Sequence, residues 1–104
     1  MPGPGGGEWL DKYRIYETET FREDLARCPL RDRDRLQRKL THMIYPALRR
    51  EPHAGPNIRK LHNWQPETWR FRSGDWRCFF QTDEKDRLVL MTALQRRSER
   101  TYRA

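Results

Sequence analysis

Hydrophobic residues alternate with arginines on both sides of Gly74 and Asp75, and this pattern predicts a β-hairpin. Gly74 supplies the positive φ that the first position of a type II′ turn requires, so Gly74 and Asp75 form the loop. Period-two alternation then sorts the side chains between two faces. One face carries Trp69, Phe71, Trp76, Cys78 and Phe80, and the other carries Arg70, Arg72, Arg77 and Phe79.

Upstream of the hairpin, the pattern predicts one strand followed by a short helix. Alternation over residues 13–17 is typical of a strand, although aromatic side chains on both faces leave its buried side open. Thr20 and Glu23 have the spacing of a capping box, and Phe21, Leu25 and Cys28 follow at helical spacing. Pro29 is expected to end this helix.

A second, longer helix is predicted to begin near Asp32, with Pro46 limiting its end. Its apolar stripe consists of Leu36, Leu40, Met43, Ile44 and Ala47. The two helices form a hairpin whose apolar side must be buried, and a sheet is the only partner that the sequence offers.

The remaining segments complete a β-α-α-β-β-β order. Residues 51–57 read as a loop, 58–66 have no clear assignment, and 82–86 form a polar turn. The nearly continuous apolar run over 87–94 predicts a central strand that is covered on both faces. We therefore expect an α+β fold in which the helical hairpin packs on a small, mainly antiparallel, twisted sheet.

Length and charge refine this picture. With 104 residues the chain makes one small domain over 9–104, after a Gly/Pro tail over 1–8 that we expect to be disordered. The formal net charge is +7 and is uneven: residues 1–56 hold 11 basic and 9 acidic residues, whereas residues 57–104 hold 11 and 6. Such a charge favours a polyanion as partner. The second half of the chain is expected to carry the surface that binds it.

Other classes of site find little support in the sequence. No run approaches the ~20 apolar residues of a membrane span, and the N-terminal segment lacks the basic and apolar regions of a secretory signal. We therefore expect a cytoplasmic protein. Cys28 and Cys78 are predicted to be reduced core thiols, and the three histidines have no zinc-ligand spacing. No cofactor or metal is expected.

The arginines of the predicted hairpin need an explanation. The register places Arg72 directly opposite Arg77, and two like charges in that arrangement destabilise a sheet unless an anion lies between them. A phosphate fits, because a guanidinium binds it in bidentate fashion. The alternative is a solvated outer face. Phe79 is either a base platform or a helix-packing residue, and Arg59 and Lys60 either reach an RNA backbone or are only solvated.

With these elements in order, the chain resembles the RelE/ParE superfamily of bacterial toxins. The resemblance runs from about Tyr13 to Tyr102, and its strongest parts are Lys60-Leu61, residues 69–77, residues 82–84, Arg96 and Tyr102. It implies a RelE-like fold and a cognate antitoxin as protein partner. That antitoxin is expected to cover the apolar and basic surface with an acidic amphipathic helix.

RelE-like members of the superfamily cleave messenger RNA in the ribosomal A site, and the resemblance implies the site residues. Arg70 and Arg72 match the pair of basic residues before the hairpin turn, and Arg77 matches the arginine after it. Arg96 and Tyr102 match the terminal arginine and aromatic residue. The best-known members have lysines at the first two positions and a longer hairpin.

This departure favours electrostatic catalysis, because an arginine is a poor general base. Under this hypothesis Arg70, Arg72 and Arg77 grip the scissile phosphate. Arg96 stabilises or protonates the leaving oxygen, and Tyr102 stacks on a base or, alternatively, caps the core. His62 is the one candidate for a base, and its alternative is an ordinary loop histidine.

Two other functions stay open. ParE-like members are non-enzymatic inhibitors of DNA gyrase and share much of the hairpin motif, and an inactive RNA-binding module would have a similar sheet face. The last residues, 95–104, form a basic tail that is expected to end in a turn or two of helix with Ser98 as cap. Arg97 and Arg100 in this tail are candidate RNA contacts or, like Arg103, solvated side chains.

Overall fold

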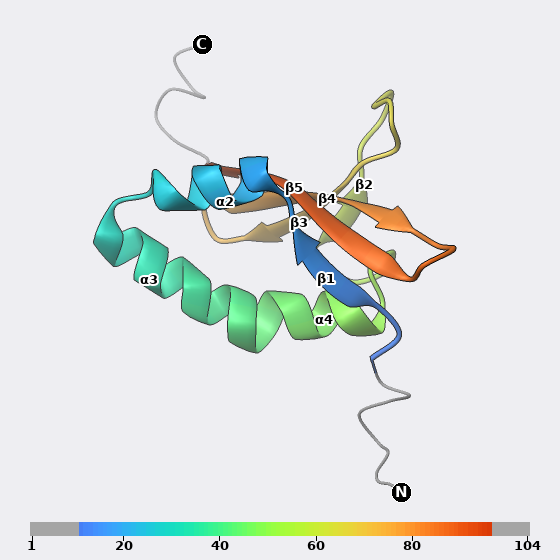
Figure 1. Ribbon diagram of the computed structural model, residues 1–104, viewed down its shortest axis with the longest axis horizontal. Helices are drawn as coiled ribbons and strands as arrows, with labels where there is room; N and C mark the ends of the chain where they lie inside the picture. The colour runs from blue at the N-terminus through green and yellow to red at the C-terminus, as the bar shows by residue number, and fades with distance from the viewer. Residues whose placement is uncertain (1–10, 97–104) are drawn as a thin grey trace, which may run out of the picture.

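The computed structural model describes residues 11–96, in which a mixed five-stranded sheet carries three α-helices and one turn of π-helix (Figure 1). The elements in chain order are β1 (Arg14–Glu17), α2 (Glu19–Ala26), α3 (Leu30–Lys39), η1 (Leu40–Ile44), α4 (Tyr45–Arg50), β2 (Ile58–Lys60), β3 (Trp69–Ser73), β4 (Trp76–Asp83) and β5 (Leu88–Arg96). The strand order is β1-β5-β4-β3-β2, and only the β1–β5 pair is parallel. The predicted fold class is confirmed, with β2 as an additional strand in the segment that the sequence left unassigned.

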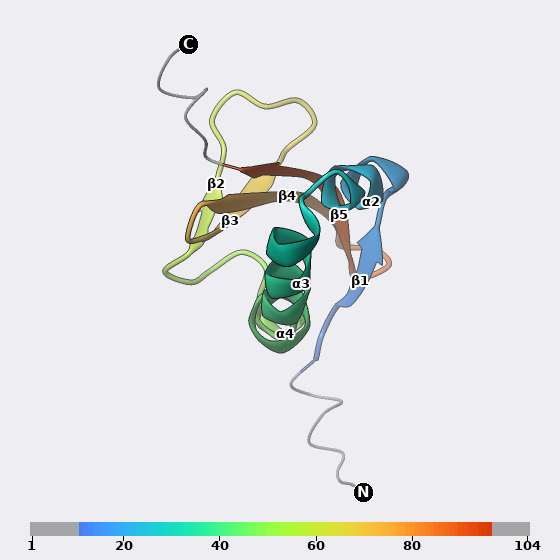
Figure 2. The same ribbon diagram turned by 90° about the vertical axis from the view of Figure 1, so that its left-hand side faces the viewer.

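Among the residues that the structure describes, one face of the sheet carries no helical layer. Helices α3 and α4 run beneath one face, whereas α2 lies beside the end of β5 that extends beyond its pairing with β1 (Figure 2). The Asp24 carboxylate of α2 accepts a hydrogen bond of 2.9 Å from the Leu94 backbone N–H. The fully buried side chains between the helices and the sheet include Phe21, Leu36, Ile44, Leu48, Phe80, Val89 and Met91.

The β3–β4 hairpin has the predicted register. Ser73 lies opposite Trp76, Arg72 opposite Arg77 and Phe71 opposite Cys78. Gly74 has a φ of 58°, which is the left-handed conformation that the first position of the turn requires. The predicted faces are confirmed as well, because Phe71, Cys78 and Phe80 are buried under the helices.

The start of the first helix differs from the prediction, whereas the second begins near Asp32 as expected. The first helix is capped by Thr18, whose Oγ1 accepts from the Phe21 N–H at 3.2 Å and donates to the Met91 carbonyl at 2.8 Å. Thr20 is an exposed residue inside the helix, so the predicted capping box was wrong. The chain turns into α2 directly after β1, and the bond to β5 selects the earlier threonine. Helix α3 begins at Leu30, two residues before Asp32.

Pro46 does not end the second helix, because a π-helical turn precedes it. The wider turn of η1 leads into α4, where Pro46 occupies the first turn and its missing N–H breaks no bond. The extra residue in η1 also rotates the apolar stripe. Leu36, Leu40 and Ile44 are buried as predicted, but Met43 is 44% exposed and Leu48 is buried in its place.

In the described part of the chain, strand β5 is internal to the sheet but is covered on one face only. Its buried residues are Val89, Met91 and Leu94, whereas Leu88 and Leu90, on either side of Val89, are partly exposed. The prediction of two covered faces was therefore wrong, because within residues 11–96 helices α3 and α4 both lie on the same side of the sheet. Among these residues, no helix has the length and apolar character needed to span a membrane.

Candidate nucleic-acid interface

Four arginines gather on the face of the sheet that turns away from α3 and α4. Arg59 lies opposite Arg70 in the β2–β3 pair, and Arg70 lies opposite Phe79 in the β3–β4 pair. Arg72 and Arg77 form the next row. Since directly opposed residues have Cβ atoms about 5 Å apart, these side chains are immediate neighbours. We call Arg59, Arg70, Arg72, Arg77 and Phe79 the arginine face.

The guanidinium groups of the arginine face have no anionic partner within residues 11–96. No hydrogen bond or ion pair joins the four side chains to another residue of this range. The Nε atoms of Arg70 and Arg77 are buried and lack a hydrogen-bond partner there. Burial lowers the pKa of Arg70, and the neighbouring charges of Arg77, Arg59 and Arg72 lower it further. The face is therefore a concentrated positive site that favours an anion.

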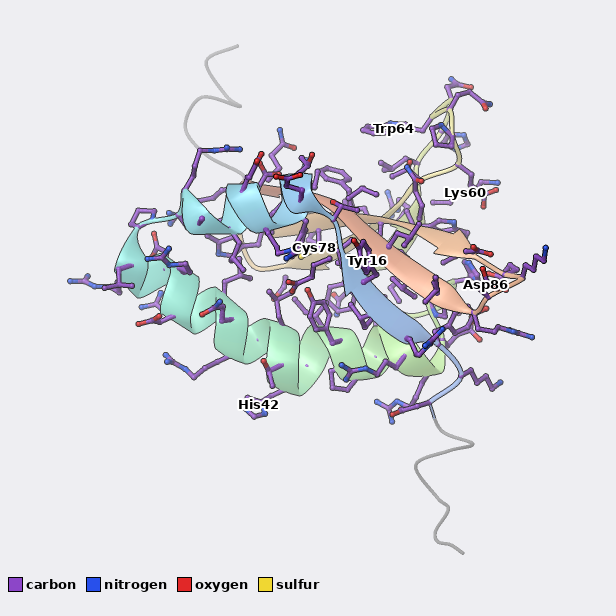
Figure 3. All side chains as sticks on the ribbon, viewed as in Figure 1. Tyr16, His42, Lys60, Trp64, Cys78 and Asp86 are labelled. Carbon is purple, nitrogen blue, oxygen red and sulfur yellow. The ribbon has the colours of Figure 1, made fainter. Side chains whose placement is uncertain are left out.

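A loop rises beside the arginine face and carries a tryptophan that sequence reasoning missed. Residues 61–68 connect β2 to β3 and project on the side of the sheet opposite α3 and α4 (Figure 2). Trp64 lies in this loop, on the other side of the sheet from His42 of η1 (Figure 3). Its ring stacks on Phe79, with centroids 5.7 Å apart and planes inclined by 16°. The tryptophan itself was the available signal in the sequence. The loop has no periodic pattern that would predict its contact with Phe79.

The predicted residues outside the hairpin have different surroundings. Lys60 lies on β2, and its Nζ is 3.8 Å from the Glu67 carboxylate. Alternation along β2 directs Lys60 to the sheet face opposite that of Arg59. His62 is exposed in the loop, and its side chain has no hydrogen bond or ion pair within residues 11–96. Arg97, Arg100 and Tyr102, the tail over 1–8 and the proposed cap at Ser98 lie outside the described residues.

Arg96 is not brought to the arginine face. It lies opposite Trp76 at the end of the β4–β5 pair, on the side of the sheet that faces the helices. Its guanidinium donates to the Asp32 carboxylate at 2.7 Å and lies 5.3 Å from the centre of the Trp76 ring. The long-range β4–β5 register decides this placement. The predicted role of Arg96 in catalysis stays a prediction, and that role requires its side chain to leave Asp32.

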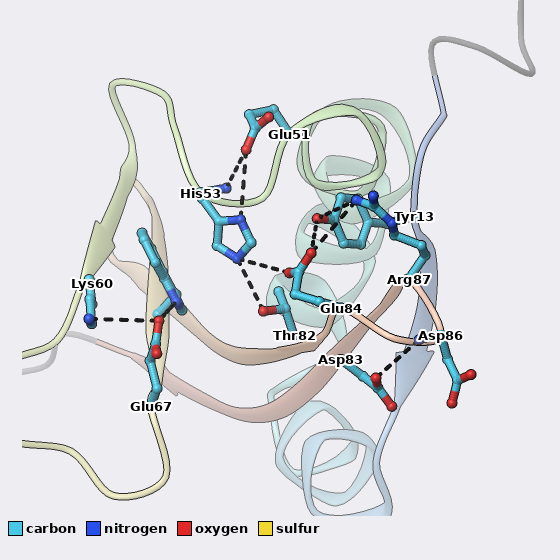
Figure 4. A network of polar contacts seen from close by, with 11 residues as sticks. Tyr13, Glu51, His53, Lys60, Glu67, Thr82, Asp83, Glu84, Asp86 and Arg87 are labelled. Carbon is cyan, nitrogen blue, oxygen red and sulfur yellow. Dashed lines mark hydrogen bonds and ion pairs between the residues drawn. The ribbon is translucent and has the colours of Figure 1, made fainter.

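A second charged region, which the sequence did not reveal, lies at the other end of the sheet (Figure 4). The Tyr13 hydroxyl donates to Glu84 at 2.7 Å and accepts from Arg87 at 3.2 Å. The Nε2 atom of His53 lies 3.1 Å from the Thr82 hydroxyl and 3.5 Å from the Glu84 carboxylate. The Tyr13 hydrogen bond lowers the pKa of Glu84, and burial raises the pKa of Tyr13. We call Tyr13, His53, Thr82, Glu84 and Arg87 the turn cluster.

The thiols and the acidic side chains add no further site. Cys28 and Cys78 are both free, and burial raises the pKa of Cys78 to about 12, which keeps it a protonated core thiol. Across residues 11–96, no group of three or more His, Cys, Asp or Glu side chains is arranged to hold a metal ion. The arginine face is thus the best candidate for a binding site.

Solved structures share the fold of this chain. No protein-family model and no curated protein sequence matches it. A chain of the RelBE2 toxin–antitoxin complex from Mycobacterium tuberculosis matches with a TM-score of 0.65 and 23% identity, covering 83% of this chain and 99% of that one. A chain of the RelE–RelB complex from Pyrococcus horikoshii matches with a TM-score of 0.62 and 21% identity, covering 85% and 98%.

A third match comes from a toxin solved without its partner. A mutant of the Escherichia coli toxin RelE in the free state matches with a TM-score of 0.57 and 18% identity, covering 88% of this chain and 92% of that one. The likeness extends over nearly the full length of all three chains and agrees with the observed helical hairpin on a mixed sheet. The chain therefore has the fold of the RelE toxins.

Proposed function

We propose that this protein is the toxin of a type II toxin–antitoxin system and cleaves messenger RNA in the ribosomal A site. Four arginines on one sheet face without a carboxylate partner in residues 11–96 are the observation that carries the proposal. Such a cluster binds a phosphodiester, and the RelE-like fold supports RNA as its source. The enzyme class is an endoribonuclease that inhibits translation.

The proposed reaction is a transesterification at one phosphodiester. The 2′-oxygen attacks the adjacent phosphorus, the bond to the 5′-oxygen breaks, and a 2′,3′-cyclic phosphate and a 5′-hydroxyl result. Arg70, Arg72 and Arg77 bind the phosphate and stabilise the additional negative charge of the pentavalent transition state. Because the Nε atoms of Arg70 and Arg77 are already buried without a hydrogen-bond partner in residues 11–96, stabilisation by these two side chains costs little reorganisation.

Proton transfer needs a group other than the arginines of the arginine face. An arginine remains protonated even where its pKa is lowered, as it is for Arg70, so the arginine face supplies charge rather than a general base. We assign the positioning of the 2′-hydroxyl to the ribosome and to the geometry of the bound RNA. Arg96 and Tyr102 keep their predicted roles at the leaving oxygen and at a base, and His62 is the alternative for proton transfer.

A cognate antitoxin is the protein partner that we propose. Two of the similar structures are complexes of a RelE-type toxin with its antitoxin, which supports this assignment. The chain carries a net charge of +7, and the guanidinium groups of the arginine face repel one another. An acidic segment that covers this face would neutralise it and block access of RNA.

Induction of the protein in bacterial cells tests the proposal. Translated transcripts are mapped for new 5′ ends, and DNA supercoiling by gyrase is measured in parallel. We expect ribosome-dependent cuts that are lost in Arg77→Ala and weakened in Arg96→Ala. Arg35→Ala, an exposed arginine of α3, is the matched control and should cut normally. Blocked gyrase with intact messengers would overturn the proposal in favour of a ParE-like inhibitor.

A further inference from the structure

Trp64 is a large aromatic side chain that the fold leaves about half exposed. The residue is 49% exposed, although burial of a tryptophan side chain is among the largest hydrophobic contributions to stability. The nearly parallel stack on Phe79 covers one side of the ring. The contact thus uses one face of the indole and leaves the remaining surface accessible to solvent.

The base of the loop is fastened, so the tryptophan is held in place. The Leu61 N–H donates to the Thr68 carbonyl at 3.0 Å, and Thr68 itself is 2% exposed. The Thr68 hydroxyl donates to the Pro66 carbonyl at 2.9 Å, and Glu67 accepts from the Trp69 indole at 3.0 Å. These contacts close both ends of the loop and limit the positions that the Trp64 ring can take.

The neighbours of this stack are the arginines. Phe79, which supports the Trp64 ring, lies directly opposite Arg70, and Arg70 lies opposite Arg59. An accessible aromatic ring next to guanidinium groups is the combination that binds single-stranded nucleic acid, since bases stack on the ring while phosphates contact the cations. Single-stranded RNA is preferred over duplex because only an unpaired base can stack on an isolated ring.

We infer that Trp64 is the platform on which one unpaired base of the RNA stacks, beside the phosphate that the arginine face holds. The inference rests on the proposed function, since RNA is the ligand. The base takes the open surface of the indole and continues the stack built on Phe79. Trp64 therefore positions the substrate and takes no part in proton transfer.

Binding of a short 2′-O-methyl RNA, which cannot be cleaved, tests this inference. Fluorescence anisotropy is measured for the unmodified oligonucleotide and for a series in which each position in turn lacks its base. With wild-type protein, one abasic position should weaken binding about 5- to 150-fold, the range expected for one stacked base. Trp64→Ala should lose the same factor with the intact RNA and no longer respond to that abasic position.

Three further variants separate stacking from folding and from charge. Trp64→Phe keeps an aromatic ring and should retain most of the affinity, whereas Tyr16→Ala, an exposed aromatic on β1, should bind normally. Trp64→Ala should keep the wild-type dependence of affinity on salt. Arg72→Gln should lower the slope of log K against log salt by about 0.7, the value for one phosphate contact on a single strand.

The outcomes are distinct. If Trp64→Ala still discriminates against the abasic position as wild type does, or if wild-type protein does not bind the RNA, the inference is wrong. If the abasic effect and its loss in Trp64→Ala are observed but no messenger is cut in cells, the platform stands and the proposed nuclease activity fails. If messengers are cut but the abasic series has no effect, only the platform fails.

Discussion

The turn cluster and the arginine face are both rich in charged side chains, but only the turn cluster pairs charges of opposite sign within residues 11–96. In the turn cluster the Glu84 carboxylate faces Tyr13, His53 and Arg87, so its charge is matched from within the chain. On the arginine face like charges face each other, as Arg72 and Arg77 do, with no carboxylate partner in residues 11–96. The turn cluster therefore pairs its charges without a ligand, whereas the arginine face has no anionic partner within residues 11–96.

This difference indicates what each region is for. Charges that are paired and hydrogen-bonded within the chain hold segments together, and the turn cluster joins the residue before β1, the segment after α4 and the β4–β5 turn. Opposed like charges cost stability, and such a cost is typical of a functional site. Substitutions in the turn cluster should therefore lower stability and leave activity unchanged. Substitutions on the arginine face should lower activity without lowering stability.

The largest effect is expected for Arg77→Ala. Removing one preorganised group that stabilises transition-state charge lowers the rate of catalysis about 100- to 1,000-fold. Ribosome-dependent cleavage of a defined messenger, followed by primer extension in a reconstituted translation system, measures this rate. The free energy of unfolding should not fall, because the substitution removes a charge that faces Arg72.

Arg77→Lys is the informative companion to this variant. A lysine keeps the charge but not the planar pair of donors, so the rate should be intermediate between wild type and Arg77→Ala. Equal rates for wild type and Arg77→Ala would contradict an electrostatic role for the arginine face.

The faces of the hairpin were predictable because they depend on local information. Gly74 determines the turn, and period-two alternation then places Phe71 on one side and Arg72 on the other. The helix boundaries depend on more distant contacts: Thr18 is the cap because it also bonds to β5, and Pro46 is tolerated because η1 precedes it. A local motif search has no access to either condition.

The parts of the candidate site that come from distant segments were not predictable. Arg96 is separated from the arginine face by the register of the β4–β5 pair, and Trp64 meets Phe79 through the conformation of a loop. The turn cluster unites residues 13, 53, 82, 84 and 87, which come from three separate segments of the chain. Pairings across long stretches of sequence leave no periodic signal.

Tyr13→Phe is expected to lower stability without affecting cleavage. The substitution removes the hydroxyl that bonds to Glu84 and Arg87 but keeps the buried ring, so the free energy of unfolding should fall by about 0.5–1.5 kcal/mol. Urea unfolding followed by circular dichroism measures the change. Tyr16→Phe, which alters an exposed ring on β1, is the control and should leave stability unchanged.

Arg72→Gln is expected to change stability in the opposite direction. Because the exposed Arg72 side chain lies opposite Arg77, replacing it with a neutral residue should raise the free energy of unfolding by about 0.2–1 kcal/mol. The gain should shrink as salt is added, since screening weakens the repulsion in the wild-type protein. A loss of stability in low salt would mean that the arginine face is not under electrostatic strain.

The smallest effect concerns the pH dependence of stability in the turn cluster. The pKa of Glu84 lies below the ordinary value of 4.5, chiefly because Tyr13 donates a hydrogen bond to its carboxylate. The folded protein therefore binds this proton less tightly than the unfolded chain does. The stabilisation is complete above the ordinary pKa and is lost as the pH falls through the lower pKa of the folded state.

Glu84→Gln should remove this dependence. Between about pH 5 and pH 3, the free energy of unfolding should decline more steeply in wild-type protein than in the variant, because only the wild type must protonate a hydrogen-bonded carboxylate. Urea unfolding at half-unit pH intervals gives both slopes. Glu23→Gln, an exposed glutamate of α2, should keep the wild-type slope. If Glu84→Gln keeps it as well, the turn cluster is not a region of matched charge, and its contrast with the arginine face is lost.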